Sequence, residues 1–260
     1  MYTIATIESG PLIRRIRYPS TRSSGPGARI SEQTHPTSDW MQRINDRHCW
    51  ESLSLWLHAY HSLDDLFVTL SYSDAWLPPT YLDAKKRLTA FLRKYREECR
   101  RLRIPHSYIY VLEGEHGDHR IHHHLIVYAG KQREVLRRLW IYGGVHIETI
   151  REFGSSRQDR SLPALQLSEY IMRDGSELGA ARYAHDCYQK IAKYMTKEPR
   201  KTGRVRPGGR AYTPSRDRYR PQVRKEQTEI GGQLPIPPGY VELTYEQKHD
   251  GILCFDRQTL

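Results

Sequence analysis

The sequence has only four cysteines and no CxxC pair, so it offers neither a disulfide framework nor a zinc ribbon. No apolar run is long enough to cross a bilayer, and the first residues lack the basic and apolar regions of a signal peptide. A GxxxxGK[ST] phosphate-binding loop is also missing, which excludes a P-loop motor. We therefore expect a cytoplasmic protein that does not enter a membrane and keeps its thiols reduced.

Positive charge is what the chain has in excess. Its 260 residues have a formal net charge of +11, which favours a polyanionic partner, most simply nucleic acid. The stretch 199–225 alone holds ten Lys or Arg residues and one acidic residue, Asp217. Charge and composition together predict three parts: a flexible N-terminal arm at 1–37, a folded domain at 38–198, and a basic Pro- and Gly-rich extension with a small hairpin at 199–260.

Hydrophobic periodicity predicts an α+β domain. Helical spacing is found at 38–60, 81–102, 131–142 and 180–197, and strand-like runs at 66–72, 108–113, 120–128 and 145–150. The run 66–72, LFVTLSY, is apolar on both faces, which favours a central position in a sheet. This order of elements predicts an antiparallel sheet with helices packed on it.

The stretch 108–128, YIYVLEGEHGDHRIHHHLIVY, is the strongest candidate for a site, and it is typical of a β-hairpin. Because side chains alternate along a strand, His122 and His124 point to one face and His123 to the other. Glu113 ends the partner strand and Glu115 follows in the turn, so two imidazoles and one carboxylate can meet. Such a group can bind a divalent cation and leave positions open for water or phosphate oxygens. Alternatively, the histidines are packed or surface residues.

A second motif, YMTK, lies in the last predicted helix, where Tyr194 and Lys197 are three residues apart and share a face. A tyrosine hydroxyl has a pKa near 10 and is a poor nucleophile. It can still attack phosphorus if a cation polarises the phosphate and an ammonium offsets the developing charge. Lys193 is an alternative source of that ammonium. The alternative for Tyr194 is an aromatic residue half-buried between helix and sheet.

Three stretches in this order, LFVTLSY, VLE…RIHHHLIV and IAKYMTK, resemble motifs one, two and three of the HUH endonucleases. More narrowly, the chain is similar to rolling-circle replication initiators of bacteriophages and plasmids, over about residues 45–216. The resemblance implies an HUH-type central antiparallel sheet of about five strands, flanked by helices, with a Mg²⁺ or Mn²⁺ site. It implies metal ligands at His122 and His124, with Glu113 as the third and Glu115 as the runner-up.

The same resemblance implies that Tyr194 is the nucleophile and that Lys197 assists it. Some members of that family have two tyrosines four residues apart, but position 190 is Lys190, which favours a single nucleophile. The expected activity is sequence-specific nicking and rejoining of single-stranded DNA through a 5′-phosphotyrosyl intermediate. Alternatives are a single-tyrosine HUH transposase, a relaxase, or a non-catalytic nucleic-acid-binding protein.

The expected partners are single-stranded DNA or an origin hairpin, and a helicase and polymerase of a bacterial host. Basic side chains near the tyrosine and in the extension are expected to bind the DNA by charge and by stacking with nearby aromatics. These candidates are Lys193, Arg204, Arg206, Arg210, Arg216, Arg218 and Arg220.

Overall fold

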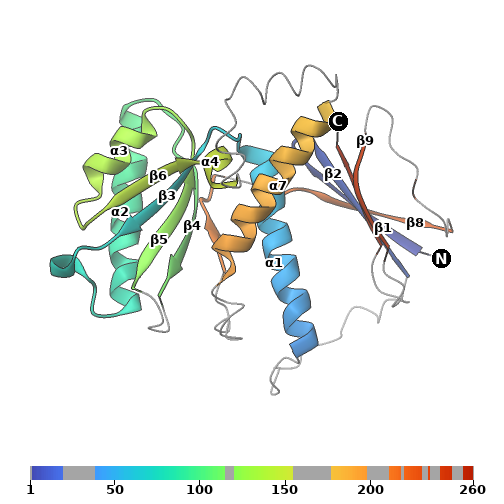
Figure 1. The fold of residues 1–260 in the computed structure, drawn as a ribbon, viewed down its shortest axis with the longest axis horizontal. Coiled ribbons are helices and arrows are strands. Elements are labelled where there is room, and N and C mark those ends of the chain that lie inside the picture. Colours follow the sequence, from blue (N-terminus) through green and yellow to red (C-terminus); the bar gives the residue numbers. More distant parts are fainter. Residues whose placement is uncertain are drawn as a thin grey trace.

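The computed structural model describes residues 2–19, 39–114, 120–154, 177–197, 211–217, 220–229, 234, 241–247 and 254–259. These residues form two five-stranded antiparallel sheets with helices between and around them (Figure 1). The predicted α+β class, with a five-stranded antiparallel sheet flanked by helices, is confirmed.

We call the first sheet the central sheet. Its strands run in the order β6 (Val145–Thr149), β3 (Leu66–Ser71), β5 (His122–Val127), β4 (Tyr108–Glu113) and β7 (Thr213–Pro214). Strand β3 therefore lies between two neighbours, as its two-sided apolar pattern predicts.

The central sheet is covered on both faces. Helices α2 (Tyr81–Arg101) and α3 (Gln132–Leu139) cover one face, and α1 (Asp39–Tyr60), α4 (Ile150–Gly154) and α7 (Glu177–Met195) cover the other. Because side chains alternate, each inner strand contributes to both cores. Within the described residues, no helix combines the length and the apolar character needed to cross a bilayer.

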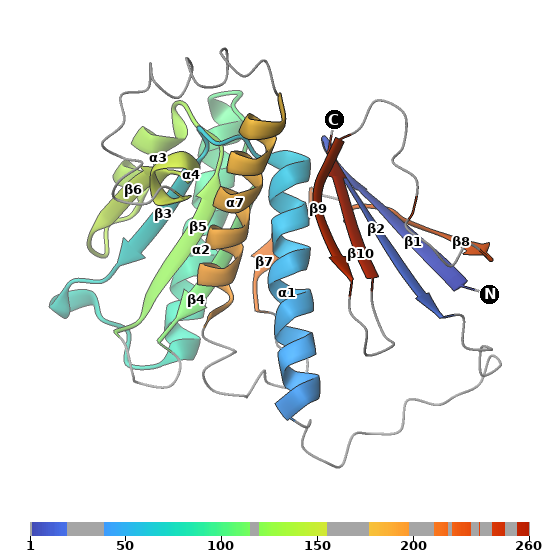
Figure 2. The same ribbon diagram turned by 45° about the vertical axis from the view of Figure 1, so that its right-hand side comes forward.

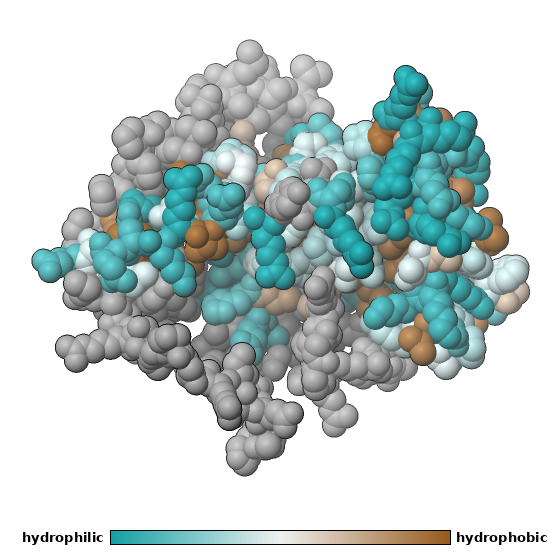
Figure 3. Space-filling model, turned by 180° about the vertical axis from the view of Figure 1, so that it is seen from behind, coloured by the Kyte–Doolittle hydropathy of each residue, from teal (hydrophilic) through white to brown (hydrophobic). Residues whose placement is uncertain are grey.

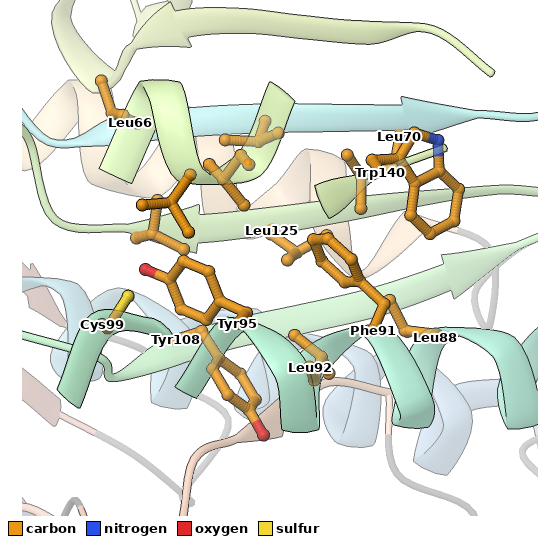
Figure 4. Close-up of a cluster of buried hydrophobic side chains, with 14 of the residues drawn as sticks. Leu66, Leu70, Leu88, Phe91, Leu92, Tyr95, Cys99, Tyr108, Leu125 and Trp140 are labelled. Atoms are coloured by element: carbon orange, nitrogen blue, oxygen red, sulfur yellow. The ribbon is translucent and has the colours of Figure 1, made fainter. Parts of the chain in front are cut away.

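Helix α2 shows why the first face closes. Thr80 caps its N-terminus by accepting a hydrogen bond of 3.1 Å from the Asp83 amide. Its buried residues recur at intervals of three and four and pack on β3 and β5 (Figure 4); they include Leu88, Phe91, Leu92, Tyr95 and Cys99. The opposite side of the helix is rich in Lys and Arg, and hydrophilic residues gather over α2 and α3 (Figure 3). Leu82, which fits the same apolar stripe by spacing, is exposed instead.

The prediction of a flexible arm at 1–37 is wrong for residues 2–19. They form the strands β1 (Tyr2–Ser9) and β2 (Leu12–Pro19), which begin a second sheet. This sheet has the order β8 (Val223–Thr228), β1, β2, β10 (Cys254–Thr259) and β9 (Val241–Gln247). The strands that complete it lie more than 200 residues away, so no local pattern reveals that the arm has partners.

The second sheet packs against α1, on the side away from the central sheet (Figure 2). The Ser9 hydroxyl donates a hydrogen bond to the Leu55 carbonyl of α1. Arg14 lies 3.3 Å from the buried carboxylate of Glu51, which also accepts from Arg47 at 2.8 Å. Helix α1 therefore has a sheet on each side, and its polar Glu51 is neutralised where the second sheet meets it.

The turn between β1 and β2 allows a direct test of this contact. Gly10 has a φ of +59°, and an added Cβ would lie 2.3 Å from the His58 carbonyl oxygen of α1. We expect Gly10→Ala to lower the free energy of unfolding by about 2–4 kcal/mol, from left-handed strain and overpacking together.

Gly130→Ala is the matched control for Gly10→Ala. Its φ is +93°, but an added Cβ would meet only the end of the Gln132 side chain, at 3.4 Å. Urea unfolding should show a loss of about 1–2 kcal/mol for this variant, from strain alone. Equal losses would mean that the β1–β2 turn does not rest on α1.

Candidate metal and nucleophile site

The β4–β5 hairpin brings one carboxylate and two imidazoles together. Its register pairs Glu113 with His122. Glu113 Oε2 lies 3.3 Å from His122 Nε2, and Glu113 Oε1 lies 3.6 Å from His124 Nε2. The two Nε2 atoms are 3.1 Å apart, and the possible ligand atoms of all three residues lie within 4.8 Å of one another.

Each ring is oriented through its other nitrogen. His122 Nδ1 donates to the Arg120 carbonyl at 2.8 Å, so Nδ1 carries the proton and Nε2 faces Glu113. His124 Nδ1 lies 3.0 Å from the Thr69 hydroxyl of β3, and its ring stacks on Phe67 at 5.2 Å. Supporting hydrogen bonds of this kind fix the ring and the tautomer of metal-binding histidines.

The donor set fits a divalent cation. With Nδ1 protonated on each ring, both Nε2 lone pairs converge within 3.1 Å, which is unfavourable unless a cation or a proton lies between them. Two imidazole nitrogens and one carboxylate form a facial set that leaves further positions for water or phosphate oxygens. His122, His124 and Glu113 could therefore hold a metal ion.

The protonation states agree with this use. Burial favours a higher pKa for Glu113, but its contacts with His122, His124 and Lys197 outweigh burial and hold that pKa well below the ordinary value. Burial also opposes protonation of His124 and lowers its pKa, whereas contact with Glu113 outweighs burial at His122 and raises its pKa. Glu113 is thus ionised and His124 neutral near pH 7, the forms in which each can bind a metal.

His123 lies on the opposite face, as strand alternation predicts. Its side chain is fully buried, with Nε2 2.8 Å from the Tyr72 hydroxyl and the ring edge-on to Trp140. Burial, together with the neighbouring His122 and His124, lowers the pKa of His123 to about 3. This residue is a neutral part of the α2-side core.

The C-terminal end of α7 brings Tyr194 and Lys197 to the ligand group. The half-buried Tyr194 ring packs edge-on against His124 at 5.1 Å, Phe153 at 5.0 Å and Phe67 at 6.0 Å. Lys197 Nζ lies 2.9 Å from Glu113 Oε2 and 3.5 Å from the centre of the Tyr194 ring. Burial favours a lower pKa for Lys197, but its contacts with Glu113 and Tyr194 outweigh burial and raise that pKa, so the ammonium stays charged beside the tyrosine.

The other tyrosine and lysine of α7 point elsewhere. The Tyr188 hydroxyl donates to the His61 carbonyl at 2.6 Å, and burial raises the pKa of Tyr188. Lys193 Nζ lies 4.5 Å from the centre of the Trp50 ring of α1. Of the four residues that sequence reasoning considered on this helix, only Tyr194 and Lys197 contact the ligand group within the described structure.

Part of the basic extension belongs to the fold. Ser215 exchanges hydrogen bonds with the backbone of Tyr108 at 2.8 and 3.1 Å, and the Tyr212 hydroxyl lies 2.9 Å from the Ser52 hydroxyl. The expectation that this extension stays unpacked is therefore wrong for residues 212–215 and for β8. Arg216 and Arg220 are exposed. The runner-up ligand Glu115 and the candidates Arg204, Arg206, Arg210 and Arg218 lie outside the described residues.

Sequence reasoning missed four residues of this site. Phe67 and Thr69 support His124, Phe153 packs on Tyr194, and the Arg120 carbonyl orients His122. Alternation in LFVTLSY places Phe67 and Thr69 on one strand face. Only the β3–β5 register, which pairs Thr69 with His124, shows that this face is the site.

Metal binding tests the division of the three histidines between the two faces. We expect His122→Ala and His124→Ala to weaken Mn²⁺ binding by more than the roughly 10- to 100-fold that loss of a supporting residue costs. His123→Ala should lower the melting temperature, because it empties a buried site, while changing Mn²⁺ affinity little. Calorimetric titration of folded protein with Mn²⁺ measures the affinities. Equal losses for all three variants would contradict the assignment.

Comparison with known proteins places this geometry in a family. Residues 65–199 match the family model of the replication-associated protein ORF2. The match runs from the start of β3 to just past Lys197, so it contains the hairpin, the ligand group and Tyr194. No curated protein and no solved structure matches the chain significantly. Since the matched region covers more than half of the 260 residues, the chain belongs to the replication-associated protein ORF2 family, which supports a role as a replication initiator.

Proposed function

We propose that this protein is a rolling-circle replication initiator of the HUH type that nicks and rejoins single-stranded DNA at an origin. One observation carries the proposal: Tyr194 and Lys197 from α7 meet Glu113, His122 and His124 from the hairpin on one face of the central sheet. A tyrosine, an ammonium and a candidate metal group are the parts that phosphoryl transfer to a tyrosine requires.

The chemical step is an exchange of phosphodiesters. The Tyr194 oxygen attacks the scissile phosphorus, the bond from phosphorus to the 3′ oxygen breaks, and the tyrosine becomes linked to the 5′ phosphate. The phenolic proton is lost and the 3′ oxygen gains one, so the products are a 5′-phosphotyrosyl link and a free 3′-hydroxyl. One phosphodiester replaces another, so the reverse attack by a 3′-hydroxyl rejoins the strand without an external energy source.

The residues around Tyr194 supply its position and charge. His124, Phe67 and Phe153 surround the tyrosine ring and restrict its rotation, which favours one direction of attack. Lys197 keeps a positive charge next to the ring, where it stabilises negative charge that develops on the phenolic oxygen.

Glu113, His122 and His124 would hold Mg²⁺ or Mn²⁺. When bound there, the cation supplies Lewis-acid polarisation of the scissile phosphate. The buried Glu113 carboxylate offsets part of the positive charge that the cation and Lys197 bring to the site.

The remaining charge suits a nucleic-acid substrate. Arg216 and Arg220 are exposed beyond β7, the edge strand next to β4. Contacts of this kind hold phosphates regardless of sequence and weaken with salt. A 3′-hydroxyl left after nicking would prime a host polymerase, and a host helicase would supply the unwinding.

The nucleophile is tested with a pool of single-stranded and hairpin oligonucleotides plus Mn²⁺, followed by a denaturing gel for covalent protein–DNA adducts. Tyr194→Phe should abolish the adduct and leave DNA binding intact, because only the attacking oxygen is removed. Tyr188→Phe is the matched control on the same helix; its hydroxyl is engaged with His61, so it should still form the adduct at some cost in stability. An adduct that persists in Tyr194→Phe would refute the assignment.

The two lysines beside the tyrosine test the electrostatic part. We expect Lys197→Met to slow adduct formation at saturating DNA by about 10²–10³-fold, the usual effect of removing one stabilising donor at the reacting centre. Lys193→Met removes the same charge four positions earlier, where it lies over Trp50, and should slow the step far less. Single-turnover rates measure both. A larger effect at Lys193 would mean that the roles of the two lysines are reversed.

A further inference from the structure

The turn after β3 carries an exposed aromatic patch that the proposed chemistry does not use. Trp76, in the short helix η1 (Asp74–Trp76), is 47% exposed, and its ring stands edge-on to Tyr142 at 5.7 Å. The Arg87 guanidinium lies 5.5 Å from the centre of the Tyr142 ring and donates to the Trp76 carbonyl. We call Trp76, Tyr142 and Arg87 the aromatic patch.

Aromatic rings beside a guanidinium are suited to unpaired nucleobases. Every base has a face that can stack on an aromatic ring, and the adjacent arginine attracts the phosphate that comes with the base. A paired base does not expose its face in this way. The chemistry of the patch therefore favours single-stranded over duplex DNA.

The patch is held rigidly although its rings are exposed. The Ser73 amide donates to the Tyr142 carbonyl at 2.9 Å, and Trp140 Nε1 donates to the Ser71 carbonyl at 2.9 Å. Gly143 packs so closely on this turn that an added Cβ would lie 2.3 Å from the Ser71 carbonyl oxygen. A ligand that stacks on a preorganised ring loses little affinity to ordering of the protein.

Arg120 connects the patch to the metal group. Its guanidinium donates to Asp74 at 2.6 Å and to the Tyr72 carbonyl at 2.9 Å, while its own carbonyl accepts from His122 at 2.8 Å. Figures 1 and 2 show η1, the short teal helix, at the same end of the central sheet as the C-terminal end of α7. The patch lies toward α2, so one DNA strand that touches both sites must pass the ends of β3 and β5, next to Arg120.

We propose that the aromatic patch is a stacking site for an unpaired base of the DNA strand that flanks the scissile phosphate, with Arg120 holding the backbone between the two sites. This inference rests on the proposed function and specifies the form of its substrate. A protein partner fits less well, since the apolar rings lie among the cations of a chain with a net charge of +11.

The first test measures affinity without catalysis, in the Tyr194→Phe background. The probe is a fluorescent oligothymidylate of about 16 nucleotides. Trp76→Ala should bind it roughly 5- to 150-fold more weakly, the usual effect of losing one stacked base, and Trp76→Phe should restore most of the affinity. Leu77→Ala is the matched control, because Leu77 is the exposed apolar neighbour without a ring and should bind as the parent does.

The second test locates the stacked base in the strand that forms the covalent adduct. Single abasic sites are placed along that strand; one position near the scissile phosphate should weaken binding to the parent, and Trp76→Ala should be insensitive at that position. Equal affinities for Trp76→Ala and Leu77→Ala, or no sensitive position, would overturn the inference. A change in self-association without a change in DNA affinity would overturn it in favour of a protein contact.

The two proposals fail separately. If wild-type protein forms no adduct with any oligonucleotide, the proposed function is wrong, whereas the oligothymidylate titration still reports on the patch. If wild-type protein forms the adduct and Trp76→Ala binds DNA normally, only the stacking site is wrong.

Discussion

Strand β5 is packed on both faces, and the rest of the site depends on that constraint. His123, Leu125 and Val127 point into the α2-side core, while His124 and Ile126 point toward α7. A slip of one residue would exchange the two sets and bury the wrong histidines in each core. Apolar packing on both faces therefore fixes the direction in which the candidate ligands point, even though the ligands themselves contribute little to that packing.

The site lies where one buried carboxylate meets several nitrogen groups. Glu113 is only 2% exposed, so its charge must be matched by His122, His124 and Lys197 or by a bound cation. The same match keeps Lys197 charged beside Tyr194. Because Lys197 immediately follows α7, docking of that helix against Phe67 and Ile126 also sets the charge environment of the tyrosine. Packing and electrostatics are thus coupled through one helix.

The second sheet joins the two ends of the chain around α1. Strands β1 and β2 pair with strands from 223–228 and 254–259, and their turn rests on α1, which packs against α7 through the α7-side core. Residues 213–217 extend the central sheet beside β4, the strand that ends in Glu113. Segments that look peripheral by composition therefore support both elements that carry the site.

Local pattern was enough for much of this protein. The hairpin, the face shared by His122 and His124, the opposite direction of His123 and the helix that carries Tyr194 and Lys197 all follow from periods of two and of three to four residues, which depend only on neighbouring residues. The second sheet, the packed part of the basic extension, the support from Thr69 and the arginine that links the aromatic patch to His122 do not. These features join residues tens to hundreds of positions apart, and their register is set by which buried surfaces fit together, so only the tertiary structure decides them.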